Sequence, residues 1–350
     1  MKNLLIIIFM CLISVESFAD IQEKWHWINV LSDKHYLTDV TYGQGKYVAS
    51  SKEDAILISE DGRNWLNVMA GAGSYNSIYS VVYGDGIFIA GGYNGLILTS
   101  KDAVTWTKAA TTDTNSIYGL AYGNGIYIAV GDNGVVLSST NGTSWKQEVS
   151  SIAASLRSVT YGNGIFIAVG DGGIIAVSKN NGVSWDIEND VTDNGFYSVA
   201  FGGNTFIAVG DKAILRSTNG TNWSTVGVDV VDTFTDVIYG NSSFVVVGKE
   251  NGTILVSQNN GTSWDLQVPY TFYMYPSISY NAVAYGNGMF VVVGDNGILL
   301  SDNHFIDFAG TTSNSTMFTG LAYGNGLFAV TGFNGHDSIY TSNDGFTWNE

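Results

Sequence analysis

The side chains best suited to chemistry are carboxylates that recur in equivalent Gly-Asp turns: Asp132, Asp171, Asp211 and Asp295. Two carboxylates roughly 5–10 Å apart, one with a raised pKa, can hydrolyse a glycosidic bond, and a ring of them can bind a cation or another ligand. Asp-Asn-Gly is also preferred turn chemistry in itself. Because nothing distinguishes one aspartate from its repeats, both a ligand-binding and a purely structural role stay open, and no residue is predicted to be catalytic.

A second candidate set lies four residues before each copy of a repeated aromatic anchor. The residue type at this position varies along the chain: Tyr79, Tyr118, Arg157 and Tyr197 in four copies, and Thr38, Thr235, Asn281 and Thr319 in the others. Variation at one place in a regular repeat indicates a surface adapted to a ligand, and tyrosine and arginine are typical of binding surfaces. Tyrosine is also a good strand residue, so a structural role remains the alternative.

One connection is longer than the rest and carries four aromatic side chains: Tyr270, Phe272, Tyr273 and Tyr275. It also holds both prolines of the chain, Pro269 and Pro276. Apolar side chains in an inserted loop are costly to leave in water. The loop is therefore expected either to cover the central channel or to contact a ligand or partner.

The histidines near the two chain ends are the remaining candidates for metal or acid–base chemistry. If the ends meet, the seam brings together Asp33, His35, Asp54, His336 and Asp337. Their spacing matches no ligand motif, and a solvated seam is the simpler interpretation. The sequence therefore predicts no metal and no cofactor.

All of these residues are positioned by a tandem repeat. A Tyr-Gly-Asn-Gly phrase or a close variant begins at Tyr42, Tyr83, Tyr122, Tyr161, Phe201, Tyr239, Tyr285 and Tyr323, at intervals of 38 to 46 residues. Each copy contains short apolar runs separated by Asn-Gly or Asp-Gly turns, which favour hairpins. Four strands per forty residues predict an all-β, closed β-propeller. We favour eight four-stranded blades, with the segment around Trp27 closing the ring; seven blades are the alternative.

The end of each copy resembles a known motif. Ser342-Asn-Asp344-Gly345-Phe-Thr-Trp348 resembles an Asp-box, or BNR repeat, and Ser59-Glu-Asp61-Gly62-Arg-Asn-Trp65 is similar. Other copies carry asparagine instead, at Asn141, Asn219 and Asn260. The resemblance implies that this side chain caps the turn and that the tryptophan anchors the hairpin. It covers nearly the whole chain, and its phrasing is most similar to Ycf48-like members of the WD40-YVTN-BNR-like repeat proteins.

Asp-box propellers include sialidases, which clamp a substrate carboxylate with three arginines. This chain has Arg63, Arg157 and Arg216 only, and the first and last are expected on the opposite face, in or beside Asp-box turns. The resemblance therefore does not extend to a sialidase site.

The leader segment and the composition limit where the protein is expected to act and which partners it can bind. Residues 1–19 have the basic start, apolar run and small residues of a signal peptide, so residues 20–350 are expected to be a single secreted or periplasmic propeller. The lone cysteine, Cys11, lies in that leader. A net charge of −17 disfavours nucleic acid and anionic membranes, no membrane insertion is expected after cleavage, and a closed ring favours a monomer.

These observations favour a non-catalytic exported propeller. It is expected to bind a protein or carbohydrate on the face that carries the Gly-Asp-Asn-Gly turns and the blade-to-blade loops. The alternative is a glycoside hydrolase or another carbohydrate-active enzyme that uses paired aspartates on that face.

Overall fold

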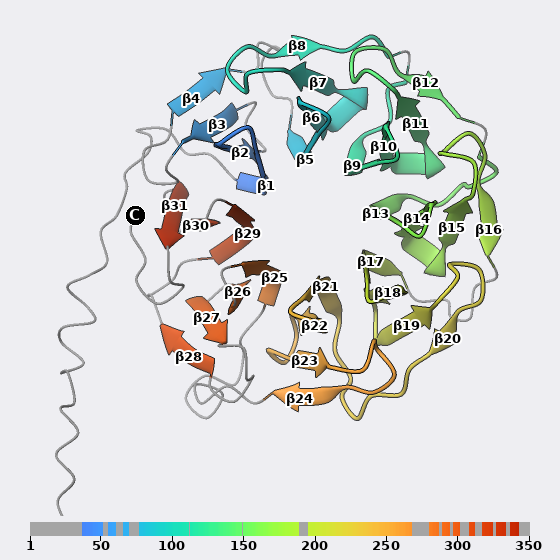
Figure 1. The fold of residues 1–350 in the computed structure, drawn as a ribbon, viewed down its shortest axis with the longest axis vertical. Helices are drawn as coiled ribbons and strands as arrows, with labels where there is room; N and C mark the ends of the chain where they lie inside the picture. The colour runs from blue at the N-terminus through green and yellow to red at the C-terminus, as the bar shows by residue number, and fades with distance from the viewer. Residues whose placement is uncertain are drawn as a thin grey trace, which may run out of the picture.

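The fold is known from a computed structural model. It describes residues 37–51, 55–60, 66–69, 77–111, 113–148, 150–188, 195–267, 280–286, 289–294, 297–301, 308–311, 317–324, 327–333 and 337–342. These residues form eight antiparallel sheets, seven of four strands and one of three, arranged around a common axis as propeller blades (Figure 1). An all-β propeller with four-stranded blades is thus confirmed.

Each sheet is built from strands that follow one another along the chain, from the axis outwards. Sheets 1 and 2 contain β1 (Leu37–Gly43), β2 (Lys46–Ser51), β3 (Ala55–Ser59), β4 (Leu66–Met69), β5 (Ile78–Gly84), β6 (Ile87–Gly92), β7 (Ile97–Ser100) and β8 (Thr107–Lys108). Sheets 3 and 4 contain β9 (Ile117–Gly123), β10 (Ile126–Gly131), β11 (Val136–Ser139), β12 (Lys146–Gln147), β13 (Leu156–Gly162), β14 (Ile165–Gly170), β15 (Ile175–Ser178) and β16 (Asp186–Glu188).

The second half of the chain repeats this plan. Sheets 5 and 6 contain β17 (Phe196–Gly202), β18 (Thr205–Gly210), β19 (Ala213–Ser217), β20 (Ser224–Thr225), β21 (Phe234–Gly240), β22 (Ser243–Gly248), β23 (Ile254–Ser257) and β24 (Asp265–Gln267). Sheets 7 and 8 contain β25 (Tyr280–Gly286), β26 (Met289–Gly294), β27 (Gly297–Ser301), β28 (Phe308–Thr311), β29 (Met317–Gly324), β30 (Leu327–Phe333) and β31 (Asp337–Ser342). Sheet 8 is the three-stranded one, and its strand β29 packs against β1.

Three of the Gly-Asp-type turns contain a short 3-10 helix: η1 (Tyr93–Gly95), η2 (Asp132–Gly134) and η3 (Asp171–Gly173). Asn133 and Gly134 have φ of 53° and 68° in the second of them. Asparagine and glycine tolerate this left-handed region best, which explains the Asn-Gly wording. No helix in the described ranges is long and apolar enough to cross a membrane.

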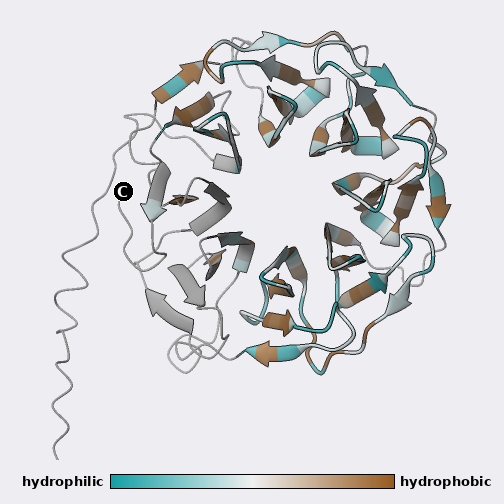
Figure 2. Cartoon of the chain, viewed as in Figure 1, coloured by the Kyte–Doolittle hydropathy of each residue, from teal (hydrophilic) through white to brown (hydrophobic). Residues whose placement is uncertain are grey.

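The core lies between neighbouring sheets. One cluster joins Ile128 and Val130 of sheet 3 to Phe166 and Ala168 of sheet 4, and all four are fully buried. Apolar residues accordingly concentrate in the strands, whereas the turns are largely hydrophilic (Figure 2). Burial of this kind is the main stabilising term in a fold without disulfides.

The repeated Tyr-Gly phrase is explained by contact across these interfaces. A Cβ atom at Gly84 would lie 2.2 Å from Cγ of Tyr122 in the next sheet, and one at Gly123 would lie 2.2 Å from Cγ of Tyr161. Such distances are far below van der Waals contact, so only glycine lets the aromatic ring lie on the backbone. The aromatic residue and the glycine of the phrase therefore act in different interfaces.

The turn that leads to the outer strand is capped by one side chain in each described copy. Asp102 Oδ1 accepts hydrogen bonds from the N–H groups of Val104 (2.9 Å) and Thr105 (2.7 Å). Trp106 Nε1 donates to the carbonyl of Ala103 at 2.7 Å. Equivalent caps are made by Asn141, Asn180, Asn219 and Asn259.

The expectation that Asn260 takes this role is wrong. Asn259 Oδ1 accepts from the N–H groups of Thr262 and Ser263, because one extra residue separates the turn's serine from its tryptophan in this copy. Asn260 instead has φ of 57°, and its carbonyl accepts a hydrogen bond from Arg216 Nε at 2.7 Å.

Candidate functional site

A β-bulge lies at the entrance of every inner strand. In β9 the pairing with β10 passes from Ile117 to Gly119, so Tyr118 is left without a partner across the hairpin. The same shift occurs in all eight inner strands. The bulged residue is always the variable one, four positions before the repeated aromatic anchor. Bulges redirect side chains and are common beside functional sites.

The bulges and the Gly-Asp turns lie on one face of the propeller. The N–H groups of Asp132 and Asp171 donate to the carbonyls of Ser116 and Ser155, each at 2.9 Å. Both acceptors immediately precede an inner strand. The predicted tyrosines, the arginine and the described aspartates are therefore brought to the same mouth of the channel.

In three consecutive sheets the bulged residue contacts the turn aspartate fourteen positions later. Arg157 makes a bidentate ion pair with Asp171, with Nε–Oδ1 and Nη2–Oδ2 distances of 2.8 and 2.6 Å. In sheet 5 the hydroxyl of Tyr197 lies 3.1 and 3.2 Å from the two carboxylate oxygens of Asp211. In sheet 3 Tyr118 lies close enough to Asp132 for that carboxylate to help raise the pKa of its phenol, and Asp132 accepts from Ser155 Oγ at 3.2 Å.

Ring contacts join these pairs across sheet boundaries. The guanidinium carbon of Arg157 lies 4.8 Å from the ring centroid of Tyr118, and the rings of Tyr118 and Tyr79 are 5.3 Å apart. Lys249 Nζ lies 5.6 Å from the ring centroid of Tyr197. Two runs of contact result, one across sheets 2 to 4 and one across sheets 5 and 6. We call these residues together the rim arc: Tyr79, Tyr118, Arg157, Tyr197 and Lys249, with Asp132, Asp171 and Asp211.

The rim arc is polar and partly exposed. Burial, followed by the hydrogen bond to Asp132, raises the pKa of Tyr118, and burial followed by the charge of Asp211 raises that of Tyr197. The hydrogen bond to Asp171 raises the pKa of Arg157. Neutral phenols and a charged guanidinium therefore persist at neutral pH, and the side chains of Arg157 and Asp171 keep 35% and 42% of their surface exposed.

The arrangement favours binding over acid–base catalysis. The rim aspartates of sheets 4 and 5 are held by a guanidinium and by a phenol of their own sheets. No group of three or more metal-ligating side chains occurs in the described ranges.

Two carboxylates that sequence reasoning missed join neighbouring sheets at the channel. Asp236 Oδ1 accepts from Ser198 Oγ of sheet 5 (2.8 Å) and Oδ2 from the N–H of Val283 in sheet 7 (3.0 Å). Burial raises the pKa of Asp236 to about 6. Asp39 Oδ2 accepts from the N–H of Val81 at 2.9 Å in the equivalent place. The sequence signal for both is a carboxylate in a strand whose other residues are uncharged.

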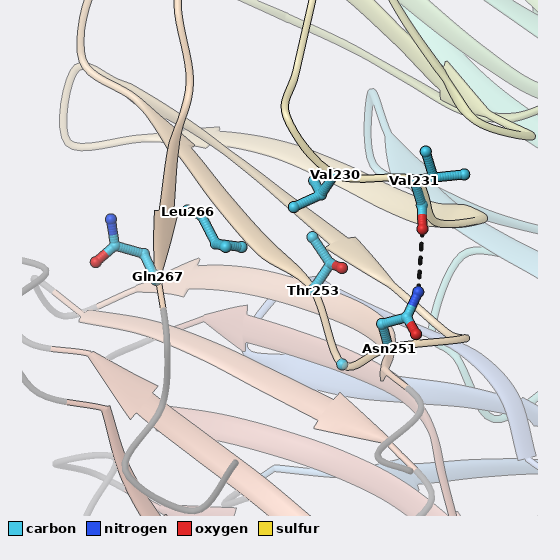
Figure 3. A pocket seen from close by; sticks show the side chains of 7 residues that line it. Val230, Val231, Asn251, Thr253, Leu266 and Gln267 are labelled. Atoms are coloured by element: carbon cyan, nitrogen blue, oxygen red, sulfur yellow. Dashed lines mark hydrogen bonds between the residues drawn. The ribbon is translucent and has the colours of Figure 1, made fainter. Parts of the chain in front are cut away.

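Lys249 is another rim residue that the sequence analysis did not single out. It stands in sheet 6 where other copies have the turn aspartate, and this difference is visible in the sequence. Asn251, two residues after Lys249, lines a pocket of about 210 Å³ together with Val231 and Leu266 (Figure 3). Asn251 Nδ2 donates to the carbonyl of Val231 at 3.0 Å, and the side chains of Val231 and Leu266 are exposed. The lining of the pocket is mostly apolar and includes no residue of the rim arc.

Several predicted residues lie outside the described residues: Tyr270, Phe272, Tyr273, Tyr275, Asp295, Asp33, His35, Asp54 and His336. The signal segment 1–19 and Trp27 lie outside them as well. Asp337 begins β31. The aromatic loop and the seam cluster therefore stay predictions.

Comparison with known proteins supports the fold. Residues 148–274 match the family described as the DUF6242 beta propeller domain, which agrees with the observed sheets. A search of curated proteins finds no significant match.

Solved structures give the same result at low sequence identity. The computationally designed Ika8 protein superposes with a TM-score of 0.72 at 12% identity, covering 90% of this chain and 99% of that one. A structure described as YCF48 bound to D1 peptide has a TM-score of 0.60 at 17% identity, covering 77% and 92%. YCF48 from Cyanidioschyzon merolae has a TM-score of 0.57 at 14% identity, covering 88% and 96%.

Proposed function

We propose that this chain is a non-catalytic binding scaffold that holds a segment of a partner protein against the rim arc. The observation that carries the proposal is the run of contacts from Tyr79 through Tyr118 to Arg157, with the pair of Tyr197 and Lys249 in the next two sheets. These residues break the symmetry of an otherwise regular propeller. Partly exposed tyrosine and arginine on a rigid frame offer contact area at low conformational cost. A similar propeller, YCF48, has been solved with a bound peptide, which supports a protein partner for this fold.

The same surface favours a carbohydrate as the second candidate ligand. Aromatic rings beside hydrogen-bonding carboxylates, such as Tyr197 beside Asp211, can stack on a sugar and bind its hydroxyl groups. A hydrolase would additionally need a carboxyl pair with separated pKa values, and the repeated engagement of Asp132, Asp171 and Asp211 argues against one.

The finer architecture is part of this proposal. We infer eight blades, closed when the segment around Trp27 supplies the outer strand of the sheet made by β29, β30 and β31, and Asp-box identity for the capped turns. Contact between β1 and β29 and the side-chain caps support this. We also propose that residues 1–19 are a signal peptide and that the mature chain is a secreted or periplasmic monomer.

An array of peptides and glycans tests the function. The purified chain is compared with a rim variant, Tyr79→Leu/Tyr118→Leu/Tyr197→Leu, and with a control, Val183→Ala/Ile187→Ala, which alters exposed residues near an outer strand. Circular dichroism checks that each is folded. We expect peptides bound by the wild type and the control to be lost by the rim variant.

Each other outcome decides against part of the proposal. Rim-dependent binding of glycans alone would replace the protein partner by a carbohydrate, and new reducing ends would identify a hydrolase. Binding that survives in the rim variant, or the absence of any binding, would overturn the rim arc as the site.

A further inference from the structure

One tyrosine of the rim arc lacks the cation that its equivalents hold. Arg157 of sheet 4 stacks on Tyr118 of sheet 3, and Lys249 of sheet 6 lies over Tyr197 of sheet 5. Tyr79 of sheet 2 is followed in the next sheet by the ring of Tyr118, 5.3 Å away and tilted by 43°. Among the described residues, no cation of this chain stacks on Tyr79.

The surroundings of Tyr79 are aromatic and acidic. Tyr93 replaces the turn aspartate in sheet 2 and is 52% exposed. Its N–H donates to the carbonyl of Ser77 at 2.7 Å. Ser77 immediately precedes β5, so the backbone of Tyr93 lies at the end of the strand that carries Tyr79. Asp132 of the next sheet is partly buried, accepts from Ser155 Oγ at 3.2 Å and acts on the pKa of Tyr118. A carboxylate has about four acceptor positions, so Asp132 can accept further donors.

From this pattern we propose that Tyr79, Tyr93, Tyr118 and Asp132 receive a guanidinium or ammonium group of the partner, so that the bound segment is basic. The inference rests on the proposed function and specifies its partner. The way Arg157 is held shows what this rim does with such a group: the ring face of one tyrosine stacks on it and a carboxylate binds its edge. Arginine is expected to bind more tightly than lysine because its planar group both stacks and pairs bidentately.

The charge of the whole molecule acts in the same direction. A net charge of −17 attracts a basic segment over long range. Exposed charges are screened by salt, so attraction alone would lose its effect as ionic strength rises. Stacking and close pairing at the proposed site should persist, and this difference can be measured.

The test uses labelled hexa-arginine, hexa-lysine and hexa-glutamate peptides with the purified full chain, by fluorescence anisotropy at about 0.15 M salt. The variants are Tyr79→Leu and Asp132→Asn. The matched control is Asp186→Asn, which removes an equal charge from an exposed position on outer strand β16. Thermal unfolding checks that all variants are folded.

We expect hexa-arginine to bind best and hexa-glutamate not at all. Tyr79→Leu and Asp132→Asn should each weaken hexa-arginine binding by about tenfold, whereas Asp186→Asn should change it by less than about twofold. Equal weakening by Asp132→Asn and Asp186→Asn would overturn the inference, because only bulk charge would then be acting. Absence of hexa-arginine binding would overturn it as well.

The array described above separates this failure from failure of the proposed function. Rim-dependent capture of neutral or acidic peptides, together with no binding of hexa-arginine, would overturn the basic partner and leave the rim arc as the site. Loss of all rim-dependent binding would overturn both.

Discussion

The direction of the variable side chain at each inner strand is set by a single extra residue. In β13 the pairing with β14 passes from Leu156 to Ser158, which leaves Arg157 as the bulged residue. Its guanidinium can then reach both Asp171 within the sheet and Tyr118 in the preceding one. Because the bulged residue is left out of the hairpin pairing, we expect substitutions there to change this surface with little effect on the core.

The cap of sheet 2 gives a prediction at the residue scale. Hydrogen bonds from the Thr105 and Val104 N–H groups lower the pKa of Asp102 from 3.8 to about 2. The unfolded chain therefore binds more protons between these values, so the cap's contribution is complete above about pH 4 and is lost as the pH falls to about 2. We expect Asp102→Asn to remove this pH dependence with little loss of stability at pH 7, because Asn141 makes the same cap.

Urea unfolding at pH 3 and pH 7 measures the effect. Asp102→Ala serves as the contrasting variant and should lose about 1 kcal/mol at pH 7, because two backbone donors lose their acceptor. The contribution of the charge itself is small, since this carboxylate is exposed to water. An unchanged pH profile in Asp102→Asn would contradict the prediction.

At the scale of the strand, close approach between sheets requires glycine at defined positions. A Cβ atom at Gly123, at the end of β9, would lie 2.2 Å from Cγ of the Tyr161 ring. The ring cannot move aside easily, because it packs in the cluster that joins sheets 3 and 4. Strand ends of this propeller are thus held by shape more than by polar contacts.

We expect Gly123→Ala to lower the free energy of unfolding by about 2–3 kcal/mol, because overpacking forces the ring or the backbone to shift. Gly227→Ala is the control, since a Cβ atom there would meet nothing within 4 Å. The control should be neutral or slightly stabilising. Equilibrium unfolding in urea compares the two, and equal losses would show that the interface yields more easily than its geometry indicates.

At the scale of the whole molecule, each sheet contacts its neighbours through cores, rings and a few polar links. Asp236 joins sheets 5, 6 and 7 by accepting from Ser198 Oγ, the N–H of Val237 and the N–H of Val283. Each inner strand is an edge strand of its sheet, so some of its backbone N–H groups have no strand partner. Asp236 accepts a hydrogen bond from one such group, the N–H of Val283. Asp39 and Asp236 therefore connect neighbouring sheets and are not part of the rim arc.

Asp236 predicts a pH dependence of the free energy of unfolding that is opposite in sign to the one expected from Asp102. Burial raises the pKa of Asp236 to about 6, above its ordinary 3.8. The folded protein therefore binds more protons between these values, so stability falls as the pH rises from about 4 to about 6. The largest effect is about 3 kcal/mol.

We expect Asp236→Asn to remove this decrease, because asparagine is neutral like the protonated carboxyl group. The free energy of unfolding of the variant relative to the wild type should therefore be higher at pH 7.5 than at pH 4.5. Asp186→Asn, which changes the net charge equally, should follow the wild type at both values. Parallel profiles for wild type and Asp236→Asn would contradict the prediction.

The all-β class, the blade-like sheets and the turn chemistry followed from the sequence, because a repeated hydrophobic period and Asn-Gly wording act locally and reappear in every copy. The variable position four residues before each repeated aromatic residue was also visible in the sequence. The β-bulges that expose it were not, since they depend on pairing across the hairpin. The capping residue could not be read either. The turn before Trp264 contains one extra residue, and only the folded turn shows that Asn259, not Asn260, accepts the two backbone N–H groups.

Only the tertiary structure decided which side chains meet. Tyr79, Tyr118 and Arg157 are about one repeat apart from one another, and they meet because neighbouring sheets pack side by side around the axis. Tyr197 and Lys249 meet for the same reason. The inter-sheet role of Asp236 has the same origin, because its partners lie 38 and 47 residues away. Local periodicity determines the strand, whereas contacts between strands of different sheets depend on their packing, which no single repeat contains.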